Sequence, residues 1–157
     1  MSNRYGLEIR AAAGPDAAGL AALLVEAGVE AGRANLSADL GARLEALQRQ
    51  GGTALVAVEW GPPSGLVALT PVVTLGAARP FGLITTLVVA GESRRRGIGR
   101  VLLKAAGRAA RQSGCDRLLI SVDPGQEALR AFCAAAGFTE EGRMQARPLL
   151  KRGSGDR

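Results

Sequence analysis

The spacing of apolar residues along the chain predicts alternating strands and helices. Runs rich in β-branched residues predict strands, and apolar positions three or four residues apart predict amphipathic helices. Strands are expected over residues 7–10, 53–59, 66–73, 81–90, 117–122 and 138–145. Helices are expected over residues 16–27, 38–50, 98–112 and 126–136, with Ser37 as an N-cap and Gly137 after the last helix. This order predicts an α/β layer fold with a mixed sheet.

The chain has the length of one domain. Its 157 residues are enough for a single core, and the Gly/Pro cluster at residues 61–65 is short and flanked by strand-like runs, as in a hairpin connection. We therefore expect one domain over residues 1–150. The polar segment 151–157 is expected to be a disordered tail.

Positive charge is concentrated in one short stretch. Twenty Lys and Arg residues against fourteen Asp and Glu residues give a net charge of +6. Residues 92–111 contain seven bases and one acid, which leaves thirteen of each elsewhere. The whole surplus therefore lies within twenty residues, and the rest of the chain is balanced.

Composition excludes several kinds of chemistry. The chain has no histidine, so a Ser-His-Asp triad and a histidine zinc site are impossible, and its two cysteines cannot build a four-thiolate site. We therefore expect no metal. The first residues lack the apolar core of a signal peptide, and no apolar stretch has the length of a membrane helix. A cytoplasmic protein with reduced thiols and no membrane partner is expected. An aromatic content of 3% argues against base stacking on a nucleic acid.

Residues 91–100, GESRRRGIGR, combine glycines, three consecutive arginines and the start of a predicted helix. Glycine allows a ligand to approach the backbone closely, and a helix N-terminus presents amides without intrahelical partners. Positive charge is unfavourable at that end of the helix dipole unless an anion is bound there. The stretch therefore predicts a phosphate site. A solvated arginine-rich face and a nucleic-acid binder that uses the same basic stripe remain open alternatives at this point.

Two common phosphate loops do not fit. A Walker loop needs Lys followed by Ser or Thr after its last glycine, and a dinucleotide fingerprint needs a third glycine after Gly97 and Gly99; both are missing. Residues 94–99, RRRGIG, instead resemble the acyl-CoA loop [Q/R]-x-x-G-x-[G/A] of the GNAT superfamily of N-acetyltransferases. Residues 87–94, LVVAGESR, are similar to the L-x-V-x-P-E-x-R that precedes it in the family. Residues 126–138 are similar to the family's N-x-x-A-x-x-x-Y-x-x-x-G-F segment, with Gln126 in place of Asn and Cys133 in place of Tyr.

This resemblance implies a GNAT acyl-CoA N-acyltransferase fold. The fold has a mixed, mostly antiparallel sheet of six to seven strands, splayed at a cofactor cleft between the strands at 81–90 and 117–122, with helices on both faces. Acetyl-CoA is implied as the cosubstrate, with its pyrophosphate on the loop and its pantetheine arm paired with the strand before it. The implied cofactor-binding residues are Leu87, Val88, Val89, Arg94, Arg95, Arg96, Gly97, Ile98, Gly99, Arg100 and Gln126.

The resemblance implies direct attack of a primary amine on the acetyl-CoA thioester, with a backbone amide near Leu87 or Val88 polarising the carbonyl. The acceptor would be a small-molecule or peptide amine held near residues 29–35 and 75–81. No group of residues in these two ranges indicates a particular acceptor. The family also allows a homodimer. No nucleic-acid partner is implied.

The chain departs from the family at the catalytic groups. Cys133 is in register with the usual tyrosine, and the sole tyrosine, Tyr5, is distant in sequence. In place of a glutamate found in the strand of some relatives, the chain has Thr85 and Thr86. Glu59 and Asp123 are the candidate bases, although surface or turn-forming roles are open for both. These departures leave open an alternative function, a GNAT-fold acyl-CoA-binding protein with weak or no catalysis.

Overall fold

The computed structural model describes residues 6–29, 36–94 and 96–150. The chain divides into two compact units, Met1–Ile120 and Ser121–Arg157. The first unit contains the sheet and three of the α-helices, and the second contains one α-helix. Residues 151–157, which were expected to form a tail, lie outside the described residues. No helix within the described ranges has the length and apolar character needed to cross a bilayer.

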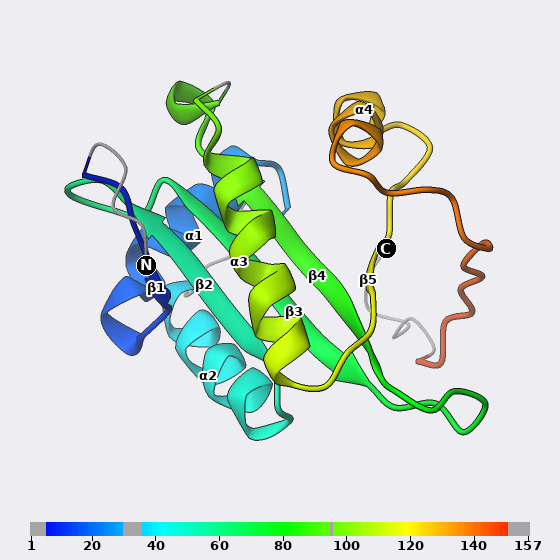
Figure 1. Ribbon diagram of the computed structural model, residues 1–157. Coiled ribbons are helices and arrows are strands. Elements are labelled where there is room, and N and C mark those ends of the chain that lie inside the picture. Colours follow the sequence, from blue (N-terminus) through cyan, green and yellow to red (C-terminus); the bar gives the residue numbers. More distant parts are fainter. Residues whose placement is uncertain (1–5, 30–35, 95, 151–157) are drawn as a thin grey trace. The chain divides into compact units, whose positions relative to one another are not determined.

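The first unit is built on a mixed five-stranded sheet (Figure 1). The strands run in sequence order across it, and all neighbours are antiparallel except the last pair, which is parallel. They are β1 (Glu8–Ala11), β2 (Thr53–Val58), β3 (Gly65–Val72), β4 (Phe81–Val89) and β5 (Leu118–Ile120). This confirms the predicted α/β class with a mixed, mostly antiparallel sheet. The expected count of six to seven strands is not reached among the described residues.

The strand predicted over residues 138–145 is not formed. The described chain after Phe138 has no strand, and residues 139–150 are all exposed. The sequence offers a physical reason, because the apolar run ends at Phe138 and the next five residues are Thr-Glu-Glu-Gly-Arg. A strand gains stability from a buried apolar face, and this segment has little apolar surface to bury.

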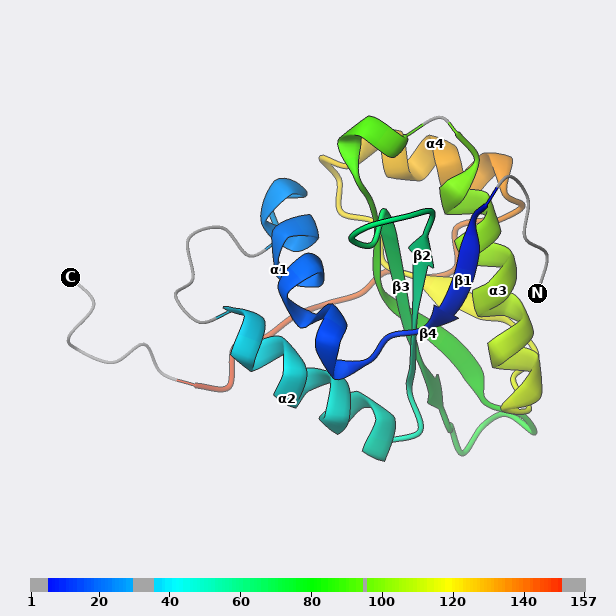
Figure 2. The same ribbon diagram turned by 90° about the vertical axis from the view of Figure 1, so that its left-hand side faces the viewer.

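Helices cover both faces of the sheet, as predicted (Figure 2). The helices α1 (Ala17–Glu26) and α2 (Leu36–Arg49) pack on one face, where Leu20, Leu24 and Leu40 share a buried cluster with residues of β2 and β3. On the other face lies α3 (Ile98–Gln112), which has the predicted bounds. Ser37 is not an N-cap, because the helix already begins at Leu36.

The helix α3 turns a row of small and branched apolar residues to the sheet and its bases to solvent. Its buried residues recur every fourth position, as expected for one helical face: Ile98, Leu102, Ala106 and Ala110. Glycines in the sheet allow this helix to come close. A Cβ atom placed on Gly65 would lie 2.8 Å from Leu102 Cδ1, so no larger residue fits there without displacement.

In the second unit, α4 (Glu127–Ala135) ends as the sequence predicts. Gly137 has a φ of +93°, the left-handed conformation that glycine adopts without a Cβ clash. Its amide donates to Ala134 O at 3.2 Å, and the Phe138 amide donates to Cys133 O at 2.9 Å. These two bonds are those of a Schellman cap, which satisfies the last carbonyls of the helix.

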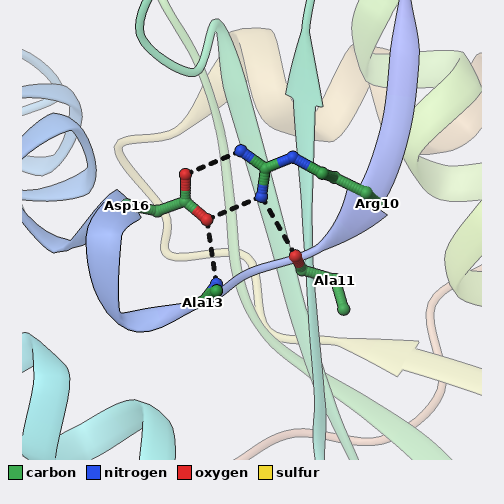
Figure 3. Close-up of polar contacts among 4 residues, drawn as sticks. All are labelled: Arg10, Ala11, Ala13 and Asp16. Carbon is green, nitrogen blue, oxygen red and sulfur yellow. Dashed lines mark hydrogen bonds and ion pairs between the residues drawn. The ribbon is translucent and has the colours of Figure 1, made fainter.

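A buried carboxylate joins β1 to the turn before α1 (Figure 3). Asp16 ends the 3₁₀ turn η1 (Gly14–Asp16), is 8% exposed, and accepts hydrogen bonds from Arg10 Nη1 and Nη2 at 2.7 and 2.8 Å. The Ala13 amide donates a further bond of 2.8 Å to the same carboxylate. The Arg10 hydrogen bond lowers the pKa of Asp16 from its usual range, because it stabilises the ionised form.

We expect Asp16→Asn to lower the free energy of unfolding at pH 7 by about 1.5 kcal/mol, the lower end for hydrogen bonds to charged groups. Because the folded-state pKa of Asp16 is lowered, its contribution is present above about pH 4 and is lost as the pH falls through the folded-state pKa. Urea unfolding at pH 7 and at pH 3 measures the difference. The exposed carboxylate in the control Asp116→Asn should change the free energy by less than about 0.5 kcal/mol. A difference between Asp16→Asn and the wild type that does not shrink at pH 3 would contradict the assignment.

Candidate functional site

The glycine-rich loop begins where β4 leaves the sheet. The Ala90 amide donates to Ser64 O at 2.8 Å, and the chain then makes the 3₁₀ turn η2 (Gly91–Ser93) before reaching Gly97. Gly97 is the N-cap of α3 and has a φ of +81°, which disfavours any residue with a Cβ. A Cβ placed there meets nothing within 4 Å, so the space beside the helix end is open.

The first amides of α3 have no carbonyl acceptor within the helix. In the first turn, the Val101 amide donates to Gly97 O at 3.1 Å, so the amides of residues 97–100 precede the first intrahelical bond. Gly97 has no side chain with which to cap them. These donors lie at the positive end of the helix dipole and fit the phosphate oxygens of an anionic ligand.

Two of the loop arginines are held by groups of the first unit. Arg94 Nε donates to Val89 O at 3.3 Å, and Arg96 Nη2 lies 2.9 Å from Glu59 Oε1. The Arg100 side chain is exposed on the first turn of α3. Arg95 lies outside the described residues. Arg94 and Arg96 thus precede the N-terminus of α3, and Arg100 lies on its first turn.

Two carboxylates support this loop. Glu59, which follows β2, is the ion-pair partner of Arg96 and has a side-chain exposure of 18%. Glu26, at the end of α1, accepts a hydrogen bond from the Gly91 amide at 2.6 Å. Glu26 was not among the residues predicted from the sequence. No local motif marks it, because its partner lies 65 residues away in the chain.

The strand β4 is paired along its whole length on one side and along only part of it on the other. Its parallel pairing with β5 ends at Ile84 and Ile120, although β4 continues to Val89. The register with β3 passes from Ala68–Thr86 to Leu69–Ile84, so Thr85 is the extra residue of a β-bulge. A bulge bends the strand locally. No other described strand pairs with residues 85–89 on the β5 side.

The hydrogen-bond pattern shows which amides face this open edge. Ala90 donates to Ser64, so Ser64 and Ala90 form a hydrogen-bonded pair, and the next pair along the register, Gly65 and Val89, is non-hydrogen-bonded. By the same alternation the N–H and C=O groups of Leu87 also point away from β3. The Val89 carbonyl, which also points away from β3, accepts the hydrogen bond from Arg94 Nε on that side. The amides of Leu87 and Val89 are therefore available to a strand-like ligand at the edge.

A pocket of about 240 Å³ lies between the first two helices and the sheet. Leucines of α1 and α2 form most of its wall, with Leu66, Ala68, Thr85 and Thr86 on the sheet side. Val29 of the predicted acceptor region also lines it. Residues 30–35 of that region lie outside the described residues, and Leu75 of the other predicted region is fully exposed.

Three predicted site residues belong to the second unit, and their assignment to the same site rests on the sequence resemblance. The Gln126 side chain accepts a hydrogen bond from the Asp123 amide at 2.9 Å, while the Gln126 amide donates to Asp123 O at 3.0 Å, so both residues shape the turn before α4. Cys133 is buried, and desolvation raises the pKa of its thiol. The thiol is therefore protonated at neutral pH. Tyr5 lies outside the described residues.

The sequence and the fold both match known acetyltransferases. The family model described as Acetyltransferase (GNAT) family matches residues 26–138. The structure is similar to a candidate acetyltransferase from Agrobacterium tumefaciens str. C58, with 30% identity and a TM-score of 0.77 over 90% of this chain and 99% of that one. It is also similar to an aminoglycoside acetyltransferase from an uncultured soil metagenomic sample, with 18% identity and a TM-score of 0.80 over 96% of this chain and 100% of that one.

A third similar structure is that of AAC(6')-Iy in complex with the bisubstrate analogue CoA-S-monomethyl-acetylneamine. It has 20% identity and a TM-score of 0.76 over 93% of this chain and 98% of that one. No curated protein sequence matches the chain. The fold is that of the GNAT acetyltransferases. Because the family model spans well over half of the sequence, the chain belongs to the GNAT acetyltransferase family.

We expect both cysteines to react slowly with a thiol reagent in the folded protein. Cys115 and Cys133 are 5% and 6% exposed, and desolvation raises the pKa of both thiols, so little reactive thiolate is accessible. At pH 8 the folded chain should react at least about tenfold more slowly than the chain unfolded in guanidinium, because burial limits access of the reagent and the raised pKa lowers the thiolate fraction. The variant Cys115→Ser measures Cys133 alone. Equal rates for folded and unfolded Cys115→Ser would contradict the burial of Cys133.

Proposed function

We propose that the protein is an N-acetyltransferase that moves the acetyl group of acetyl-CoA to a primary amine. The observation that carries the proposal is the juxtaposition of two binding elements in one unit. The uncapped start of α3 lies directly after β4, and the edge of β4 is open at Leu87 and Val89. One ligand with a pyrophosphate at one end and an amide-containing arm at the other fits both elements, and acetyl-CoA has this form.

The loop residues have separate roles in this proposal. The amides of residues 97–100 bind the pyrophosphate oxygens, and Gly97 allows the close approach. The guanidinium groups of Arg94, Arg96 and Arg100 add charge-assisted hydrogen bonds. Gln126 is the cofactor-binding residue proposed for the second unit, by its register with the family motif.

The strand edge positions the reacting thioester. A pantetheine arm paired with Leu87 and Val89 continues the hydrogen bonding that β5 leaves incomplete beyond Ile84. The Leu87 amide is the donor that we assign to the acetyl carbonyl, where it stabilises the negative charge that develops on oxygen. The described part of the chain supports catalysis by positioning, because Thr85 and Thr86 occupy the strand where a general base was sought and neither takes a proton at neutral pH.

Gly97→Glu should weaken CoA binding by at least about tenfold, measured by calorimetry, since one carboxylate at the phosphate site opposes the charge-assisted bonds there. The new side chain has open space, so the packing of the protein itself should be unaffected. Gly97→Ala carries the same strain at a φ of +81° without the charge, and it is the matched control. Equal CoA affinity in the Glu variant and the Ala control would overturn the assignment of the loop.

Glu59→Gln distinguishes a base from a loop support. Because Glu59 is paired with Arg96, we expect kcat at saturating substrates to stay within about twofold and CoA affinity to change by no more than about fivefold, the scale of a surface ion pair. Glu92→Gln removes one carboxylate from the exposed 3₁₀ turn η2 of the loop itself and serves as the control. A fall in kcat of about a hundredfold or more, with loss of the basic limb of the pH profile, would instead identify Glu59 as the general base.

The acetyl transfer itself is tested by single-turnover measurement with a panel of primary amines. N-acetylated product is the expected result. CoA binding without transfer to any amine would favour the alternative, an acyl-CoA-binding protein of this family.

A further inference from the structure

We propose that the acceptor is a primary amine carrying one compact hydrophobic group, which is bound in the pocket between α1, α2 and the sheet. This inference rests on the proposed function and adds the substrate class. It is carried by three properties of the pocket: the apolar character of its wall, its volume, and its position beside the open edge of β4.

The pocket wall is aliphatic on three sides. Leu20 and Leu24 of α1, Leu40 and Leu44 of α2, and Leu66 of β3 all contribute to it. Most of these leucines belong to the buried cluster that joins the two helices to the sheet, so the wall is a fixed part of the core. The burial of an apolar group in such a pocket is favourable by about 25 cal/mol per Å² of surface removed from water.

The pocket has no carboxylate among the described residues that line it. Among the described lining residues, Arg43 is the charged one. Glu26, the last residue of α1, accepts the Gly91 amide at the loop. A polycationic acceptor needs anionic partners for its charges when it leaves water, because an unpaired buried charge is costly. The pocket therefore matches a monoamine with an apolar group and does not match a polycationic aminoglycoside, the class named for one of the similar structures.

The volume sets the size of that group. An enclosed apolar cavity of about 150 Å³ is known to bind benzene. The pocket of about 240 Å³ therefore accepts a benzene-sized ring or a branched aliphatic chain, with room for a short link to the nitrogen. A group much larger than this must project past Val29, which is 56% exposed.

The sheet side of the pocket leads to the site assigned to the thioester. Thr86 lines the pocket, and the next residue, Leu87, directs its amide to the open edge of β4. An amine whose apolar group fills the pocket therefore has its nitrogen at the strand position that precedes the assigned oxyanion donor.

An apolar site also prepares the amine for attack. Desolvation disfavours the ammonium form, so the acceptor binds preferentially as the neutral amine, with its proton left in solvent. The nitrogen lone pair then forms the C–N bond to the acetyl carbon, and the C–S bond breaks with its electron pair leaving on sulfur. One N–H proton passes through solvent to the thiolate, so that the products are the amide and the CoA thiol. This sequence needs no strong base at Thr85 or Thr86.

The test measures kcat/KM for the full chain with acetyl-CoA and two series of amines. The first series is ethylamine, butylamine, hexylamine and benzylamine, and the second is ethanolamine, spermidine and sisomicin. The expected result is a rise of about fourfold per buried methylene along the first series, from about 0.8 kcal/mol per methylene, ending when the pocket is full. Spermidine or sisomicin as the preferred acceptor would overturn the inference while leaving the proposed function intact.

Two variants of α2 locate the effect. Leu44→Glu places a carboxylate in the pocket wall, whereas Gln48→Glu places one at an exposed position one turn later on the same helix, which does not line this pocket. We expect Leu44→Glu to lower kcat/KM for hexylamine at least about tenfold with unchanged CoA affinity, and Gln48→Glu to stay within about twofold. Equal effects of the two variants would overturn the assignment of the pocket. If Leu44→Glu does not fold, Leu44→Ala provides the test by moving the optimum to a longer chain, and an unmoved optimum would contradict the proposal.

A binding measurement separates this inference from the proposed function. Calorimetry with CoA present should show that hexylamine binds and that ethanolamine does not. Hexylamine binding without any acetyl transfer would support the pocket and overturn the proposed function. Acetyl transfer to ethanolamine with no preference for hexylamine would support the proposed function and overturn the assignment of the pocket.

Discussion

Unequal hydrogen bonding along β4 is the constraint on which the proposed site depends. A backbone N–H or C=O removed from water needs a partner, and β3 pairs with β4 along its whole length. The strand β5 does so only as far as Ile84, beyond which the amides of Leu87 and Val89 face an open edge. The bulge at Thr85 marks the same point. A ligand that pairs with this edge completes the strand, and the chain after β4 leads directly to the start of α3.

The two faces of the sheet have different roles. On one face α3 packs closely over Gly65, which fixes the helix end and its free amides relative to the end of β4. On the other face α1 and α2 enclose an apolar pocket that reaches Thr85 and Thr86. The strand between them is the shared element. In the proposed reaction the acyl donor and the acceptor thus meet at one strand, and catalysis follows from their positions more than from any single acid or base.

Much of this architecture was predictable from local sequence. The bounds of α3 follow from apolar residues at helical spacing, and Gly137 closes α4 as expected because glycine adopts the left-handed conformation without a clash. The loop at residues 91–100 could be predicted as a candidate site for the same reason, since its glycines and arginines are adjacent in the chain. The strand predicted at 138–145 was wrong, because the residues directly after Phe138 are polar and the segment has little apolar surface to bury.

The sequence by itself determined the fold class and the order of helices and strands as far as α4, and it predicted a phosphate-binding loop at residues 91–100, because each of these depends on residues that are neighbours in the chain. Tertiary structure decided the rest. The pairing of Glu59 with Arg96, the bond from Gly91 to Glu26 and the leucine pocket all join residues that lie far apart in sequence. Such contacts form only when the packing of helices on the sheet sets the distances, and no periodicity or motif records them. For this reason the loop at residues 91–100 was predictable as a candidate site, whereas only the structure brought together the residues that line the pocket.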